Sequence, residues 1–306
     1  MNGITQSHMQ PQHGGDISPR AETGGEELTI MSMELLFSRI KQLPVIPKLL
    51  HELMQSFADD NSHIEDISKK IAMDQVISAK VLKMANSAAY RRGQDVTSIE
   101  QAVIRLGFNA LRSLVVASGL MTTFKTPANF DKTRFWVETF QVATIAKALA
   151  ADCKKIEPDT AFTCALLHNI GELLIQSAMP EEAGLINMAI SKGCGRIDAQ
   201  REMLGYDYSR VGAELAKRWQ LSDTFVRAIA QQLDPLGFTP VSPEAILIRL
   251  AMFVSFAWNA GVPPQVIVAR FPTPLAQHLG IEPQQLAERL EELHQQGNEL
   301  AVMLTN

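Results

Sequence analysis

The spacing of apolar residues predicts a chain built from short helices. From Met31 onward, large apolar side chains recur every three or four positions, for example at Leu286, Leu290 and Leu293. That period gathers them on one face of an α-helix, whereas a half-buried strand would alternate every second residue. No convincing β-hairpin is present in the sequence. The pattern therefore favours an all-α fold.

Helix-start signals divide this pattern into about a dozen short helices. Ser62–Glu65 and Ser98–Gln101 are capping boxes, in which a serine hydroxyl and a glutamate or glutamine side chain serve the free amides of the first turn. Ser242–Pro243 and Glu282–Pro283 place a proline in the first turn, where its missing amide hydrogen costs nothing.

Composition shifts mark three regions. Residues 1–30 are polar, rich in glycine and proline and nearly free of large apolar side chains, which predicts a disordered tail without a signal peptide. Residues 31–262 form the helical body, with an N-terminal part at 31–125 and a second part at 126–262. Residues 263–306 contain two arginines and five glutamates, a net charge of −3, and are predicted to be an acidic helical extension.

Charge and cysteine content narrow the class of protein. Across 306 residues, 28 lysines and arginines oppose 33 acidic residues, so no global basic signature of nucleic-acid binding exists. The three cysteines form no C-x-x-C pair, as is typical of reduced thiols in a cytoplasmic protein. The longest uncharged stretch in the apolar segment that ends the body, 250–262, is too short to span a membrane. We expect a cytoplasmic protein without a membrane partner.

The segment Asp66–Arg112 is locally basic and raises the alternative of DNA binding. It carries eight basic and four acidic residues, a net charge of +4. Two short helices with basic residues on the second resemble a helix-turn-helix motif. Basic residues on solvated helix faces are the simpler interpretation. The expected turn lacks a glycine and the segment lacks interleaved aromatic residues. DNA binding is therefore not expected.

His168 is the strongest chemical signal in the sequence. It lies inside the apolar run Phe162–Glu172, where an imidazole needs a hydrogen-bond partner or a metal. If the run is one helix, Cys164 and Glu172 share the face of His168. A metal centre needs several convergent ligands, so a structural histidine is the better interpretation from these residues alone.

Six motifs follow one another along the chain. They are LPVIPKLL at 43–50, NSAAY at 86–90, SIEQAVIRLGFNALRSL at 98–114, FW at 135–136, ALLHNIGELLI at 165–175 and VGAELAKRWQL at 211–221. With these motifs, the region from about Met33 to about Gly261 resembles the HDOD domain family. This family consists of all-α, multi-helical, HD-like bundles that act in bacterial signal transduction, and it is related to HD-domain metal-dependent phosphohydrolases. The resemblance implies that residues 31–262 form an HDOD domain.

The resemblance also implies where metal ligands would lie. The histidine of the HD doublet is kept and its aspartate is replaced by an amide, while the other ligand positions mostly carry residues of different chemistry. These positions are His168 and Asn169 for the doublet, Glu138 for an early histidine, Tyr208 after Asp207 for a later one, Gln231 and Gln232 for a histidine pair, and Met252 for a late aspartate.

Those replacements argue against a working metal site. Amides are weak ligands for divalent metals, and methionine suits only soft ions. His168, Glu138 and Asp207 remain weak candidates for a loosely held metal, but they would not activate water for phosphoester attack. We expect no catalytic residues and no cofactor. We expect the imidazole of His168 to hydrogen-bond to Glu138 or Cys164 within the protein. Nucleotide-binding and hydrolase fingerprints such as G-x-G-x-x-G and G-x-S-x-G are absent.

The sequence therefore predicts a non-catalytic module of bacterial signal transduction. It would act through contacts with other signalling proteins, with a nucleotide or cyclic dinucleotide as a further candidate ligand. The alternative is a divergent metal-dependent phosphohydrolase that acts on nucleotides or cyclic dinucleotides. The remaining histidines are placed in the tail, at 8 and 13, or on capping or polar helix positions, at His51, His63, His278 and His294.

Overall fold

The computed structural model describes residues 33–38, 44, 47–55, 64–87 and 93–305, and these residues form helices and no strands. The predicted all-α fold is confirmed. The tail at 1–30 lies outside the described residues. After a helix at 33–38, the elements are α2 (Lys48–Gln55), α3 (Ile64–Met73), α4 (Gln75–Ala85), α5 (Ile99–Leu106), α6 (Phe108–Thr123), α7 (Lys132–Cys153), α8 (Pro158–Leu167), α9 (Ile170–Ala178), α10 (Pro180–Ser191), α11 (Arg196–Leu204), α12 (Tyr208–Arg218), α13 (Asp223–Gln231), the 3-10 helix η2 (Pro235–Gly237), α14 (Pro243–Asn259), α15 (Pro264–Ala269), α16 (Thr273–Leu279), α17 (Gln284–Ala287) and α18 (Leu290–Thr305).

Local capping explains where several of these helices begin. The Ser98 hydroxyl accepts a hydrogen bond from the amide of Gln101 at 3.2 Å, as predicted. Ser242 does the same for α14, which begins at the predicted Pro243. The Ser62 hydroxyl of the other capping box lies outside the described residues. Helices are more numerous than expected because brief interruptions split long apolar patterns, as Gly107 does between α5 and α6 with a φ of 80°.

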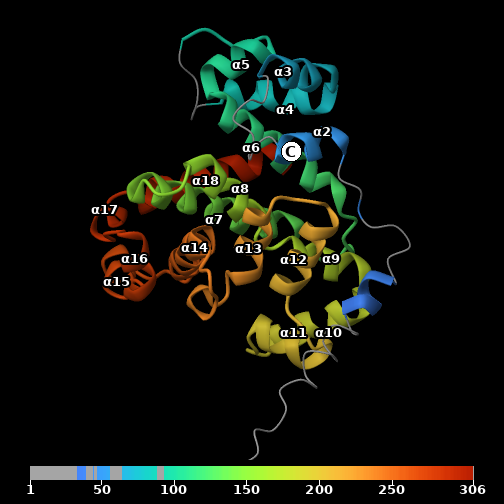
Figure 1. Cartoon of the computed structure of the whole chain (residues 1–306), viewed down its shortest axis with the longest axis vertical. Helices are drawn as coiled ribbons and strands as arrows, with labels where there is room; N and C mark the ends of the chain where they lie inside the picture. The colour runs from blue at the N-terminus through green and yellow to red at the C-terminus, as the bar shows by residue number, and fades with distance from the viewer. Residues whose placement is uncertain (1–32, 39–43, 45–46, 56–63, 88–92, 306) are drawn as a thin grey trace, which may run out of the picture.

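Helix α7 is the centre of the molecule. Helices α8, α14 and α18 all pack against it, as Figure 1 shows for this middle layer. Its buried side chains face several directions and include Trp136, Phe140, Ile145 and Leu149. A helix that is apolar around most of its circumference is stable only when neighbours cover it. None of the helices in the described ranges combines the length and apolar character that crossing a bilayer requires.

Helices α3, α4 and α5 lie at the opposite end of the molecule from α10 and α11 in Figure 1. The N-terminal helices are joined to the rest through Trp219, which directly follows α12. Its indole Nε1 donates to the carbonyl of Pro44 at 2.9 Å, and its own carbonyl is 3.0 Å from Nε2 of His51. Two of the six motifs thus meet in space. Buried apolar side chains of both parts form one continuous cluster; the boundary at residue 125 stays a prediction.

Helix α18 of the C-terminal segment packs closely along α7. A Cβ on Gly297 would lie 2.8 Å from the Cα of Gln141, so only glycine permits this approach. The Gln141 amide donates to Asn298 at 2.8 Å and its oxygen accepts from Asn259 of α14 at 2.8 Å. The acidic residue Glu291 on the same helix is exposed. The segment predicted as an extension therefore contributes a helix to the middle layer.

Candidate functional site

His168 and Asn169 form the junction between α8 and α9. Helix α8 ends at Leu167 and α9 begins at Ile170, so the apolar run is not one helix. The expectation that His168 and Glu172 share a helix face is wrong for this reason. The backbone amide of His168 donates to the carbonyl of Ala165 at 3.3 Å, which closes a tight turn instead of continuing the helix.

The imidazole of His168 is buried and bonded to its own turn. Nδ1 lies 2.5 Å from the carbonyl oxygen of Ala165, so the imidazole bonds to Ala165 and not to Glu138 or Cys164, contrary to expectation. Burial lowers the pKa of His168 to about 4; the bond to Ala165 opposes this shift and the positive charge of Arg196 adds to it. The imidazole is therefore neutral at neutral pH and donates from Nδ1.

The three weak candidates for metal binding are engaged elsewhere. Glu138 accepts from Nε of Arg134 at 2.8 Å, and its side chain is 43% exposed. Asp207 is buried, accepts from the first amides of α12 and pairs with Arg201 at 2.8 Å. Among the described residues, no three His, Cys, Asp or Glu side chains gather as a metal site requires. The suggested grouping with His168 is therefore wrong.

The other predicted positions belong to the packed interior. Gln232 donates from Nε2 to the carbonyl of His168 at 2.6 Å, which ties α13 to the α8–α9 junction. Gln231 accepts from the amide of Ser242 at 2.7 Å. Tyr208 is buried, and burial raises its pKa. Met252 on α14 is half-buried against the core. The amide of Asn169, at the aspartate position of the doublet, donates to the hydroxyl of Thr139 at 2.9 Å, which a carboxylate could not do.

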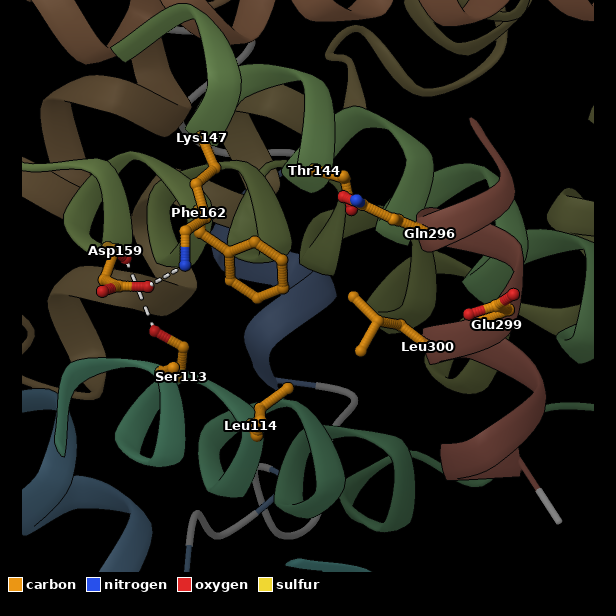
Figure 2. Close-up of a pocket in the computed structure, with 10 residues that line it drawn as sticks. Ser113, Leu114, Thr144, Lys147, Asp159, Phe162, Gln296, Glu299 and Leu300 are labelled. Atoms are coloured by element: carbon orange, nitrogen blue, oxygen red, sulfur yellow. Dashed lines mark hydrogen bonds and ion pairs between the residues drawn. The ribbon is translucent and has the colours of Figure 1, made fainter. Parts of the chain in front are cut away.

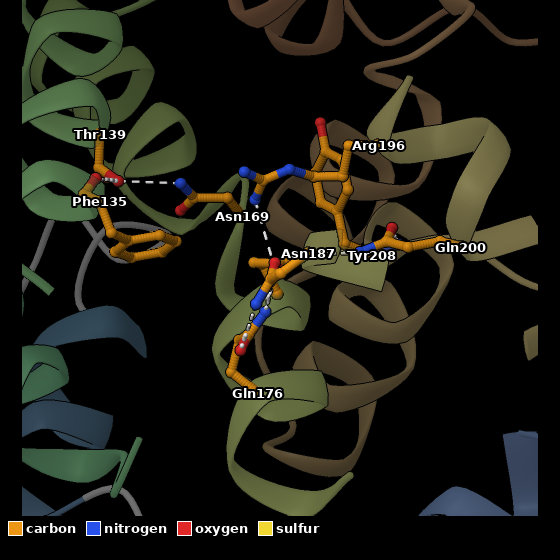
Figure 3. A network of polar contacts seen from close by, with 9 residues as sticks. Phe135, Thr139, Asn169, Gln176, Asn187, Arg196, Gln200 and Tyr208 are labelled. Carbon is orange, nitrogen blue, oxygen red and sulfur yellow. Dashed lines mark hydrogen bonds and ion pairs between the residues drawn. The ribbon is translucent and has the colours of Figure 1, made fainter. Parts of the chain in front are cut away.

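A buried carboxylate organises the helices beside this junction. We call Glu172, Gln176, Asn187, Arg196 and Gln200 the Glu172 network. Glu172 is 1% exposed and accepts from Gln176 at 2.8 Å and Gln200 at 2.6 Å, with Arg196 at 3.4 Å. Figure 3 shows Gln176, Asn187 and Gln200 converging from α9, α10 and α11. Sequence reasoning missed these partners, although an acidic residue in the apolar run at 165–175 was a signal for them.

Helices α9 and α12 touch through their backbones. A Cβ on Gly171 would lie 2.0 Å from the carbonyl oxygen of Tyr208 and 2.5 Å from the amide nitrogen of Gly212. Such an approach requires glycine, because any side chain would collide with backbone that cannot move aside. Helices α9 and α12 are therefore in direct backbone contact close to His168 and Tyr208.

The opposite end of α8 borders a cavity of about 190 Å³ that sequence reasoning missed. Lys147 of α7 pairs there with Asp159 at 2.6 Å. The hydroxyl of Ser113 lies 3.1 Å from that of Thr163. The hydroxyl of Thr144 is buried and has no hydrogen-bond partner among the residues that the structure describes. Figure 2 shows side chains from α6, α7, α8 and α18 around this space, which is lined by Ala110, Ser113, Leu114, Thr144, Lys147, Asp159, Phe162, Gln296, Glu299 and Leu300.

The NSAAY motif begins with a structural asparagine. The side chain of Asn86 donates to the carbonyl of Val96 at 2.8 Å and accepts from its amide at 2.7 Å, which closes the loop between α4 and α5. Arg105 donates to the carbonyl of Ala85 at 3.3 Å. At least one arginine of the basic segment therefore holds this loop. Residues 88–92 lie outside the described ranges.

His294 also has a structural position. His294 is buried and stacks on Trp258 with a centroid distance of 4.9 Å, and burial lowers its pKa to about 4. Its predicted polar position is wrong, because this face of α18 turns toward α14. His278 is exposed. Three other histidines, at 8, 13 and 63, lie outside the described residues.

Comparison with known proteins supports this architecture. The HDOD domain family matches residues 43–235. A structure from Shewanella amazonensis SB2B named "Putative phosphohydrolase" is 35% identical and covers 88% of this chain and 97% of its own, with a TM-score of 0.76. The structure of an HDOD domain protein from Geobacter sulfurreducens is 22% identical in sequence. The match covers 90% of this chain and 99% of that one, and its TM-score of 0.77 shows the shared fold.

Sequence relatives are longer than the matched region. A protein from Treponema pallidum (strain Nichols), described as uncharacterized, is 27% identical over 205 residues, which are 62% of this chain and 37% of the relative. The protein YuxH from Bacillus subtilis (strain 168) is 32% identical over 62 residues, or 20% of this chain and 15% of YuxH. The chain thus matches well under half the length of these curated relatives.

Proposed function

The chain belongs to the HDOD domain family, and we propose that it is a non-catalytic regulatory module of bacterial signal transduction. Its fold is shared with a structure from Marinobacter aquaeolei VT8 named "Putative signal transduction protein", which is 20% identical, covers 92% of this chain and 66% of its own, and has a TM-score of 0.76. The proposal depends on the chemistry of the positions where related enzymes would hold a metal.

The observation that carries the proposal is the internal bonding of these positions. His168 bonds to Ala165, Asp207 caps α12, and Gln232 donates to the carbonyl of His168. Each of these hydrogen bonds stabilises a helix end, and no three His, Cys, Asp or Glu side chains of the described residues gather around a common centre. Without convergent ligands, no bound metal lowers the pKa of a water molecule for attack on a phosphoester.

Contacts with another signalling protein would supply the output of such a module. Helix α18 buries its apolar face against α7 and leaves Glu291 and Glu292 exposed. These carboxylates favour a partner with a basic surface, because complementary charge guides encounter and orientation. A signal would then shift the population of conformations that the partner recognises.

The second candidate function is that of a divergent phosphohydrolase acting on nucleotides or cyclic dinucleotides. It is favoured by the 35% identity to the Shewanella amazonensis protein named "Putative phosphohydrolase". The two functions differ in whether a metal is bound and used.

Metal content and turnover separate the two candidates. Protein purified without chelator is analysed for Fe, Mn, Ni and Zn, and then assayed with bis(4-nitrophenyl) phosphate and a cyclic dinucleotide after each metal is added. We expect far less than one metal per chain and no turnover above that of a His168→Gln variant. Near-stoichiometric metal and turnover, both lost in His168→Gln, would establish the hydrolase instead.

The contact surface is tested by charge reversal. Proteins cross-linked to the wild-type chain in a bacterial extract are compared with those cross-linked to a Glu291→Lys, Glu292→Lys double variant. The matched control reverses two exposed glutamates elsewhere, Glu181 and Glu202. We expect specific partners to be lost only from the α18 variant. The same proteins recovered with all three chains would contradict a role for α18.

A further inference from the structure

The cavity at the N-terminal end of α8 has the features of a ligand site. We propose that it binds a small single-ring organic amine. Asp159, at the cavity, precedes His168 by nine residues, which corresponds to about 13 Å along the helix. The proposal is therefore separate from the proposed function, and neither depends on the other.

The size of the cavity limits the ligand to one ring with a short chain. Its volume is about 190 Å³. A cavity of about 150 Å³ lined by apolar side chains accommodates benzene in an engineered protein. Leu114, Phe162 and Leu300 supply buried apolar surface here. An aromatic ring would displace water from these side chains and gain dispersion contacts with them.

A polar partner is missing on one wall. Thr144 is 7% exposed, lines the cavity, and has a buried hydroxyl oxygen without a hydrogen-bond partner. A buried hydroxyl in this state costs free energy, which a ligand with an N–H group would recover. The nearby hydroxyl of Thr163 is different, because it donates to the carbonyl of Asp159 at 2.9 Å.

The charge of the lining favours a cation over an anion. Lys147 is already neutralised by Asp159 at 2.6 Å. Glu299 accepts from the neutral amide of Gln295 at 3.1 Å, and no Lys, Arg or His of the described residues pairs with its carboxylate. An ammonium group would pair with Glu299, whereas a carboxylate ligand would be repelled by it.

The ligand would touch elements that are distant in the sequence. The lining comes from α6, α7, α8 and α18, so one small molecule contacts both the N-terminal part and the C-terminal segment. Because it binds the folded chain alone, it should stabilise this arrangement in proportion to its occupancy.

Three molecules of the same shape test the chemistry. Phenethylamine, 2-phenylethanol and 3-phenylpropionate are titrated into the full chain by calorimetry. We expect phenethylamine to bind with a dissociation constant of about 0.1–1 mM, the alcohol more weakly, and the acid weakest of all. Equal binding of all three, or no saturation by the amine at about 10 mM, would overturn the proposal.

Variants then locate the site. Glu299→Gln should weaken amine binding about tenfold and leave binding of the alcohol unchanged, because only the charge is removed. Thr144→Val should weaken the amine about fivefold at nearly constant side-chain volume. Glu288→Gln, an exposed change just before the same helix, is the control and should bind like the wild type. Thermal unfolding confirms that each variant is folded; unchanged amine binding in Glu299→Gln would contradict the assignment.

Discussion

The two ends of α8 differ in how the polar side chains around them are hydrogen-bonded. At the C-terminal end, His168 and Asn169 donate to Ala165 and Thr139, and the neighbouring Glu172 accepts from two side-chain amides. Two buried oxygens at this end, Oδ1 of Asn169 and Oε1 of Gln232, have no hydrogen-bond partner among the described residues. At the N-terminal end, a cavity remains and one of its hydroxyls has no partner. The end that resembles an enzyme site is thus the one whose side chains mainly hold helices together.

Helix α7 shows the same contrast within two turns. The Thr139 hydroxyl donates to Phe135 and accepts from Asn169 at 2.9 Å, whereas the Thr144 hydroxyl is unpartnered. Both threonines are buried. Burial of a polar residue therefore does not by itself indicate function, because the bonding state of each atom distinguishes a structural group from one that can receive a ligand.

The largest expected effect comes from the glycine at the closed end. Gly171→Ala should destabilise the fold by at least about 3 kcal/mol, because its Cβ would lie 2.0 Å from the Tyr208 carbonyl. Urea denaturation measures this change. Gly184→Ala is the control: no heavy atom lies within 4 Å of its added Cβ, and it should be neutral or gain about 0.5–1 kcal/mol. Equal stabilities for the two variants would mean that α9 and α12 are not in backbone contact.

Removing a carboxylate should also change the stability of the fold by different amounts at the two ends of α8. Glu172→Leu leaves the amides of Gln176 and Gln200 without their acceptor and should cost about 2–3 kcal/mol. Glu299→Leu at the cavity should change stability by less than about 0.5 kcal/mol. Denaturant midpoints with unchanged slopes provide the measurement. Similar losses in both variants would show that the contrast between the two ends is incorrect.

Burial of His168 predicts that the free energy of unfolding depends on pH. Its pKa is lowered to about 4 in the folded chain, from 6.5 when exposed. Below pH 6.5 the unfolded chain binds a proton that the folded chain does not, so stability falls as pH decreases toward 4. For His168 alone this amounts to about 2 kcal/mol between pH 6 and 4.5.

The variant His168→Gln isolates this contribution. Chemical denaturation at several pH values should show a shallower loss of stability for His168→Gln than for the wild type. His278→Gln, at an exposed position, should keep the wild-type slope. Identical slopes in all three chains would mean that His168 is accessible to protons in the folded state.

The smallest expected effect distinguishes the two threonines of α7. Thr139→Val removes the acceptor of the Asn169 amide and should cost about 1 kcal/mol, whereas Thr144→Val should be neutral or slightly stabilising. Thermal unfolding of the two variants measures the difference. A larger loss for Thr144→Val would show that its hydroxyl already has a partner.

Local rules predicted much of the fold. The spacing of apolar residues identified the helices. The capping box Ser98–Gln101 located the start of α5, and the pair Ser242–Pro243 located the start of α14. These features depend on residues within one turn of each other. The helix break at His168 escaped prediction because apolar residues continue on both sides of it, so the periodicity does not reveal the change in direction.

Long-range contacts set the limit of sequence reasoning at the site. The position of His168 was recognised, but its bond to Ala165 depends on the local turn. Gln200 donates to Glu172, which is 28 residues earlier in the chain. The cavity is lined by residues of α6, α7, α8 and α18. Such convergence depends on tertiary packing, which amphipathic patterns do not specify.

The side chain of Gln141 has a consequence for the order of folding during synthesis. It joins α7 to Asn298, which is 157 residues later in the chain. At about 5–20 residues per second, the ribosome needs roughly 8 to 30 s to make that intervening stretch. The face of α7 that α18 covers must wait at least that long for its native neighbour. Nascent chains of this protein therefore have an interval in which chaperones can reach apolar surface that the finished fold conceals.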